Sequence, residues 1–134
     1  YMEKFCIIKN NNSNQNVLNK YLLSTSFFYL EKSYKSSQRY IDGILKIIEF
    51  IEKNEFYTLR IYYDKSIYKN DKYANLFKII STNKSVELYE YSCLEFIRTK
   101  PFHIGTFGTL LRFMPLFEKS QYEIIYILDI DDTN

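Results

Sequence analysis

Residues 122–134 read YEIIYILDIDDTN. The five residues Ile124 to Leu128 are all apolar, which is typical of a strand that is covered on both faces of a parallel sheet. Three aspartates follow this run: Asp129, Asp131 and Asp132. We therefore predict a central strand over 123–131 whose carboxyl end is strongly acidic.

Strands and helices alternate along the rest of the chain. We predict strands over 3–9, 20–28, 58–64 and 86–91, and helices over 36–54, 71–81 and 106–117. Gly43 within the first helix indicates close packing against a strand, and Pro115 is expected to bend or shorten the last helix. The last helix is expected to have one apolar stripe: Phe107, Leu110, Leu111, Met114 and Phe117. The alternation predicts an α/β fold, a Rossmann-like and mostly parallel sheet with helices on both faces.

Length, composition and charge narrow the class of protein. The 134 residues fit one domain, with an N-terminal strand and an Asn-rich flexible segment over 1–16 and the domain proper over 17–134. The net charge is +2 and no run of basic residues occurs, which argues against a nucleic-acid partner. No apolar stretch approaches the roughly 18 residues of a membrane span, and no secretory signal opens the chain. We therefore expect a cytoplasmic protein.

The terminal aspartates suggest a metal site. Ligands of open α/β sheets bind beyond the carboxyl ends of the strands, where these aspartates are predicted to lie. Asp129 and Asp131 would lie on the same side of an extended chain. Two carboxylates with this spacing suit Mg²⁺ or Mn²⁺, which can in turn hold a diphosphate. A solvated acidic strand end, without a ligand, is the alternative.

Two enzyme classes use the pattern DIDDT of residues 129–133. Nucleotide-sugar glycosyltransferases bind a metal–diphosphate with DxD. Haloacid-dehalogenase phosphatases carry DxDxT after their first strand, where the first Asp is the nucleophile and the second a general acid and base. Three strand–helix units precede the motif here, which favours the glycosyltransferase.

The block GTLLRFMPLFEKSQYEIIYILDIDD, residues 108–132, resembles glycosyltransferases of the GT-A fold. It is most similar to glycogenin and to bacterial galactosyltransferases, and more loosely to glycosyltransferase-like proteins of large DNA viruses. Those families carry an arginine on a helix, a Leu-Pro-Leu-like segment and a hydrophobic strand that ends in DxD. The matching features here are Arg112, MPLF over 114–117, and the aspartates at 129 and 131.

The resemblance implies roles for eight residues. Asp129 and Asp131 would hold Mn²⁺ or Mg²⁺, and Asp132 would lie beside the metal or touch the donor. Arg112 would approach the donor sugar or phosphate, although a surface arginine without a function is equally compatible with its position. The nucleotide pocket would be lined by a polar loop of three residues and by one acid: Ser24, Thr25, Ser26 and Asp64. Turn chemistry alone is the alternative for the three hydroxyl residues.

The implied reaction is transfer of a sugar from a UDP- or GDP-sugar to a hydroxyl of a sugar, protein or lipid acceptor. In the family, the acceptor half follows the DxD strand, and this chain ends at Asn134. We therefore expect a GT-A domain truncated after that strand, which by itself could be an inactive fragment. A phosphatase with Asp129 as nucleophile and a non-catalytic interaction module remain the competing hypotheses.

Overall fold

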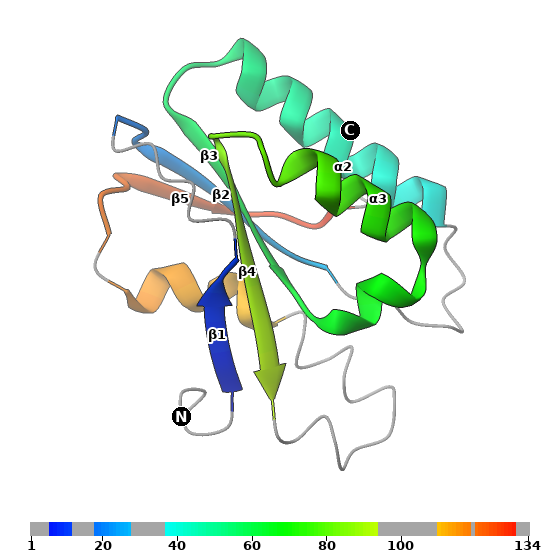
Figure 1. The fold of residues 1–134 in the computed structure, drawn as a ribbon. Helices are drawn as coiled ribbons and strands as arrows, with labels where there is room; N and C mark the ends of the chain where they lie inside the picture. Colours follow the sequence, from blue (N-terminus) through cyan, green and yellow to red (C-terminus); the bar gives the residue numbers. More distant parts are fainter. Residues whose placement is uncertain (1–5, 12–17, 28–36, 94–109, 119, 131–134) are drawn as a thin grey trace.

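A computed structural model describes residues 6–11, 18–27, 37–93, 110–118 and 120–130. These residues form one five-stranded sheet in the order β1-β4-β3-β2-β5 (Figure 1). The strands are β1 (Cys6–Asn10), β2 (Tyr21–Phe27), β3 (Tyr57–Tyr63), β4 (Val86–Cys93) and β5 (Ile124–Ile127). The helices are α2 (Ser37–Lys53) and α3 (Asp71–Ile80), with the 3₁₀ helices η1 (Lys65–Lys69) and η2 (Leu111–Phe117).

The sheet is mixed but mostly parallel. β2, β3, β4 and β5 are parallel to one another, whereas β1 pairs with β4 in the antiparallel sense. The chain passes from β2 through α2 to β3 and through α3 to β4, and then returns to place β5 on the other side of β2. The direction of winding therefore reverses between β2 and β5. Doubly wound folds bind ligands at the carboxyl end of such a reversal.

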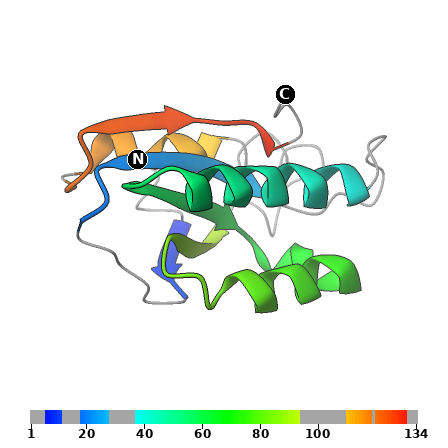
Figure 2. The ribbon, with the colours of Figure 1, turned by 90° about the horizontal axis from the view of Figure 1, so that it is seen from above.

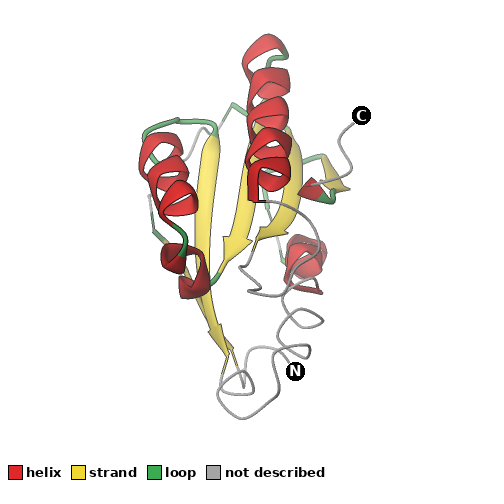
Figure 3. Ribbon diagram, turned by 90° about the vertical axis from the view of Figure 1, so that its right-hand side faces the viewer, coloured by secondary structure: helices red, strands yellow, loops and turns green. Residues whose placement is uncertain are grey.

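Helical segments lie on both faces of the sheet, as predicted. α2 and α3 run side by side (Figure 2) and lie on the same face (Figure 3). The alternate residues Leu59, Ile61 and Tyr63 of β3 belong to the core beneath them. Tyr62, which points to the opposite face, packs in a second and smaller core with Leu111 of η2. The α/β class with a mostly parallel sheet is thus confirmed, and its assignment to the GT-A type stays a prediction.

The two predicted central helices are confirmed nearly to the residue. α2 buries five isoleucines on the side that faces the sheet: Ile41, Ile44, Ile47, Ile48 and Ile51. α3 buries Tyr73, Leu76, Phe77 and Ile80. Its first turn is capped by Asn70, whose side chain accepts hydrogen bonds from the backbone N–H groups of Lys72 and Tyr73 at 2.9 and 3.2 Å.

The predicted strand over 123–131 is wrong in its length and in its surroundings. β5 has four residues, and it forms the edge of the sheet within the described part of the chain. Its side chains at Ile124 and Tyr126 are 45% and 41% exposed. An apolar run predicts that a strand forms, but it does not reveal whether the strand pairs on one or both sides or how deeply its side chains are buried.

The predicted helix over 106–117 is helical wherever it is described, but its type changes along the chain. Leu110 is α-helical, Leu111–Phe117 form the 3₁₀ helix η2, and residues 106–109 lie outside the description. Pro115 lacks the N–H that an α-helix needs, and its ring is buried together with Leu111. The predicted apolar stripe is confirmed in part: Leu111 is buried and Met114 packs against the same small core, whereas Leu110 is exposed and Phe117 is 82% exposed. Phe107 lies outside the described residues.

Gly43 of α2 lies against the segment that follows β5. A Cβ added at Gly43 would overlap the carbonyl oxygen of Ile130 and lie 2.9 Å from its Cγ2. Ile130 itself is buried, at 4% exposure. The prediction of close packing is therefore confirmed, although Gly43 meets the segment that follows β5 rather than a strand.

In Gly43→Ala, overpacking should lower the free energy of unfolding by about 1–3 kcal/mol. Alanine in a helix interior should raise it by about 1 kcal/mol, so we expect a net loss of stability. Urea denaturation measures the difference, and Leu45→Ala, at an exposed position of the same helix, should change stability by about 0.5 kcal/mol or less. A stabilised Gly43→Ala variant would show that Ile130 does not pack against α2.

Candidate functional site

Two of the predicted acids lie at the carboxyl edge of the sheet, after the two strands that flank β2. Asp64 follows β3 directly, and Asp129 follows β5 after one residue. β2 lies between these two strands. Asp131 and Asp132 lie outside the described residues, so the structure reports only the first acid of the DxD pair.

The backbone before Asp129 is held by β2. The N–H of Leu128 donates to the carbonyl of Ser24 at 2.9 Å. The hydroxyl of Thr25 donates to the carbonyl of Leu128, also at 2.9 Å. Because both polar groups of Leu128 are bonded to one strand, the position from which the Asp129 side chain departs is well defined.

Arg112 and Asp129, which are 17 residues apart, form an ion pair. Nη1 of Arg112 bonds to Oδ1 of Asp129 and also donates to the carbonyl of Leu128 at 3.2 Å. The Arg112 side chain is 17% exposed and that of Asp129 is 54% exposed. Burial lowers the pKa of Arg112, because it disfavours the charged form of the guanidinium. A carboxylate beside a buried cation acts in the opposite direction. The structure thus joins two of the residues on which the family resemblance was based.

Ser24, Thr25 and Ser26 lie inside β2, so their predicted position in a polar loop is wrong. Ser24 and Thr25 are buried, and the hydroxyl of Ser24 donates to the carbonyl of Arg112 at 2.7 Å. The Ser26 hydroxyl is buried without a partner among the described residues. Two of the three hydroxyls therefore hold η2 and β5 against β2, and their contact with a nucleotide stays a prediction.

Asp64 begins η1. Its carboxylate accepts a hydrogen bond from the backbone N–H of Ser66 at 3.1 Å and another from the Ser66 hydroxyl. Burial raises the pKa of Asp64, and the two bonds from Ser66 oppose that rise. The bond from the backbone N–H of Ser66 makes Asp64 the cap of η1. The predicted contact of Asp64 with a base or ribose is not tested.

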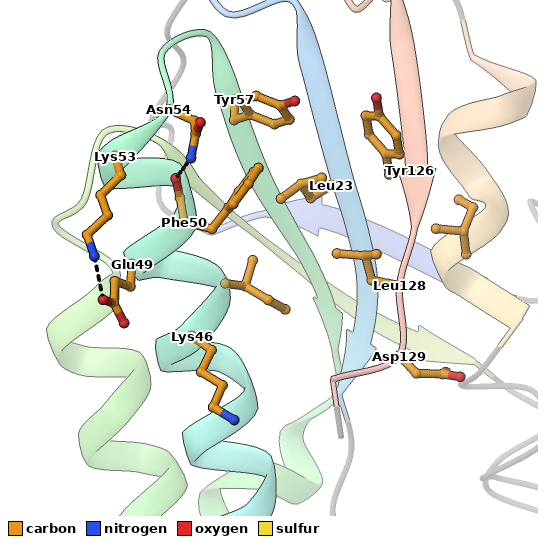
Figure 4. A pocket seen from close by; sticks show the side chains of 12 residues that line it. Leu23, Lys46, Glu49, Phe50, Lys53, Asn54, Tyr57, Tyr126, Leu128 and Asp129 are labelled. Carbon is orange, nitrogen blue, oxygen red and sulfur yellow. Dashed lines mark hydrogen bonds and ion pairs between the residues drawn. The ribbon is translucent and has the colours of Figure 1, made fainter. Parts of the chain in front are cut away.

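A groove of about 850 Å³ lies beside this edge, between α2 and β5 (Figure 4). Its walls carry the aromatic rings of Phe50, Tyr57 and Tyr126, with Leu23 at the back. Asp129 lines one end, but in Figure 4 its side chain points away from α2. The groove therefore follows the face of the sheet, whereas the Arg112–Asp129 pair lies at the carboxyl edge, which is the better candidate site.

The described residues do not complete a metal site by themselves. Within the described ranges, no three His, Cys, Asp or Glu side chains gather closely enough to hold an ion. Asp131 is not among those ranges, so the metal prediction rests on Asp129 and stays a prediction.

No helix in the described ranges has the length and apolarity to cross a membrane.

A buried charge cluster on the other face of the sheet was missed by sequence reasoning. Arg60 of β3 is paired with Glu87 of β4, at 3.2 Å, and both side chains are almost fully buried. Arg60 also forms an ion pair with Glu118 at 3.4 Å and donates a hydrogen bond to the Tyr62 hydroxyl at 3.1 Å. The hydroxyl of Tyr122 donates a hydrogen bond to Glu87. A charged residue in the middle of the apolar stretch TLRIYY was the signal that could have found this cluster. Since Glu118 and Tyr122 lie between η2 and β5, the cluster fixes that connection to the sheet.

No protein-family model, curated protein or solved structure matches this chain. The arrangement at the carboxyl edge is therefore the basis for any statement about function.

Removing one member of the Arg60–Glu87 pair should be costly. We expect Arg60→Met to lower the free energy of unfolding by about 3–5 kcal/mol, because Glu87 would stay buried without its partner. Adding Glu87→Leu should recover much of the loss. Lys9→Met removes an exposed partner of Glu90 in the same sheet and should cost at most about 1 kcal/mol in urea denaturation. Equal losses for Arg60→Met and Lys9→Met would contradict the buried pair.

The capping role of Asp64 can be separated from its charge. We expect Asp64→Ala to cost about 1 kcal/mol, whereas Asp64→Asn should retain the cap. The raised pKa means that the folded protein keeps this proton to a higher pH than the unfolded chain does, so the contribution of Asp64 to stability falls as pH rises above about 4. Thermal unfolding from pH 3 to 7 measures this, and the fall should be absent from Asp64→Asn. Parallel profiles for both proteins would argue against a raised pKa.

Proposed function

We propose that this chain forms the nucleotide-sugar-binding half of a metal-dependent glycosyltransferase of the GT-A type. The observation that supports the proposal most directly is the Arg112–Asp129 pair at the carboxyl edge, next to the reversal between β2 and β5. Doubly wound folds bind nucleotides at such an edge. The pair also joins the arginine and the aspartate on which the family resemblance depends.

The exposed carboxylate of Asp129 suits a divalent cation. Carboxylate oxygens are the ligands that Mg²⁺ and Mn²⁺ prefer, and an ionised carboxylate offers about four acceptor positions. In the described part of the structure Arg112 bonds to one of its oxygens, Oδ1. Asp129 and Asp131 would hold the ion, and Asp132 would lie beside it. When bound, the ion would stabilise the negative charge that develops on the leaving diphosphate.

The protein's own groups would bind and orient the donor. Arg112 presents a planar cation that suits phosphate oxygens. Ser26 and Asp64 lie at or near the ends of the strands on the same edge, where a base or ribose could be bound. The donor would be a UDP- or GDP-sugar. Its anomeric carbon would lose the bond to the diphosphate oxygen and gain a bond to an acceptor hydroxyl, which gives up its proton. The acceptor, a sugar, protein or lipid hydroxyl, and the cytoplasmic location are parts of the same proposal.

Binding of the donor nucleotide tests the proposal. UDP or GDP with Mn²⁺ should raise the melting temperature by several degrees, since a ligand at about 100 times its Kd stabilises a protein by about 2.7 kcal/mol. Asp129→Asn should abolish the rise. Glu52→Gln, which removes an acid from the exposed side of α2, is the matched control and should retain it.

Two results would oppose the glycosyltransferase. One is an unchanged melting temperature with both nucleotides, with and without Mn²⁺. The other is a covalent beryllofluoride adduct at Asp129, which would indicate a phosphatase nucleophile instead.

A further inference from the structure

Arg112 occupies the carboxylate that the proposed metal would need. Its Nη1 bonds to Oδ1 of Asp129, and the pair lies at the carboxyl edge with the Asp129 side chain still half exposed. A cation that approaches Asp129 alone meets the positive guanidinium. A diphosphate that approaches Arg112 alone meets the negative carboxylate. Each ligand by itself must therefore break the pair or bind next to a like charge.

The two ligands together remove both penalties. When a metal ion binds Asp129 and a phosphate binds Arg112, the Arg112–Asp129 pair is replaced by a metal–Asp129 pair and a phosphate–Arg112 pair. The metal and the phosphate also attract each other. We propose that Arg112 couples metal binding to diphosphate binding, so that the site takes the two as a unit and holds either one weakly. This inference rests on the proposed function, which it extends by assigning Arg112 the role of making the binding of each ligand depend on the other.

The surroundings of Arg112 allow this exchange. Its backbone is fixed because its carbonyl accepts the Ser24 hydroxyl at 2.7 Å. Its guanidinium is less constrained, since in the described part of the chain Nη1 makes all of its hydrogen bonds and the buried Nε makes none. The guanidinium can therefore turn from Asp129 to a phosphate while the chain around it stays in place.

The size of the effect follows from the exposure of the pair. Ion pairs with one exposed partner contribute up to about 1 kcal/mol, which corresponds to a factor of about five in binding. Mn²⁺ should therefore bind about two- to fivefold more tightly once the pair is removed. The diphosphate should bind more weakly, because its cationic partner is lost.

Titration calorimetry of the whole chain tests the coupling. Mn²⁺, UDP and GDP are titrated singly, and each nucleotide is then titrated in the presence of Mn²⁺ with correction for the metal–nucleotide complex in solution. The proteins are the wild type, Arg112→Met, Arg112→Lys and Lys46→Met. Methionine keeps the half-buried stem of Arg112, and lysine keeps its charge. Lys46 is the matched control. It is a cation that lines the same groove as Asp129, and the described contacts include no ion pair between Lys46 and Asp129.

In the wild type, each ligand should strengthen the other by about fivefold or more. Arg112→Met should bind Mn²⁺ alone more tightly than the wild type and keep only the coupling that the direct metal–phosphate attraction provides, Arg112→Lys should be intermediate, and Lys46→Met should match the wild type. The coupling role is overturned if the wild type binds Mn²⁺ and nucleotide independently, which needs no variant, or if Arg112→Met retains full coupling. Absence of all binding to the wild type would overturn the proposed function as well, and so differs from both of these results.

Discussion

The hydroxyl groups of β2 are the constraint on which the site depends. Ser24 and Thr25 lie where a buried parallel strand usually carries aliphatic side chains, and their hydroxyls bond to the carbonyls of Arg112 and Leu128. One strand therefore positions both the segment that carries the arginine and the segment that carries Asp129. Buried hydroxyls without partners would be destabilising, so the same bonds that build the site also preserve the core.

Two further contacts restrict the acidic segment from its other sides. Ile130 packs against Gly43 of α2, which allows this close approach because it has no side chain. On the opposite face, the Arg60 cluster holds the residues that connect η2 to β5. Asp129 is thus placed by three separate parts of the fold while its own side chain stays half exposed. A rigid backbone with an accessible carboxylate is what a binding site at a strand end requires.

Local sequence patterns predicted much of this fold. They failed for the features that depend on contacts between residues far apart in the sequence. The apolar periods of α2 and α3 and the strands around them could be read directly, because each depends on neighbouring residues. Gly43 indicated a close approach but not its partner, Ile130, which is distant in the sequence. The edge position of β5 could not, since Ile124 and Tyr126 look the same in a covered strand. Ser24 and Thr25 resembled a turn because their partners are about a hundred residues away. The family resemblance placed Arg112 and Asp129 in one site, but it did not predict that the two residues form an ion pair.

The central claim is that a divalent cation carrying a nucleotide binds at Asp129, at the carboxyl edge between β2 and β5. Paramagnetic broadening by Mn²⁺ in amide NMR spectra, recorded with UDP or GDP present, tests this most directly. The account predicts that signals from Ser26, Phe27, Asp129 and Ile130 broaden first, while those of Lys20, Phe56 and Ser85 at the opposite edge stay sharp. Broadening that is uniform, absent or strongest at the opposite edge would contradict it.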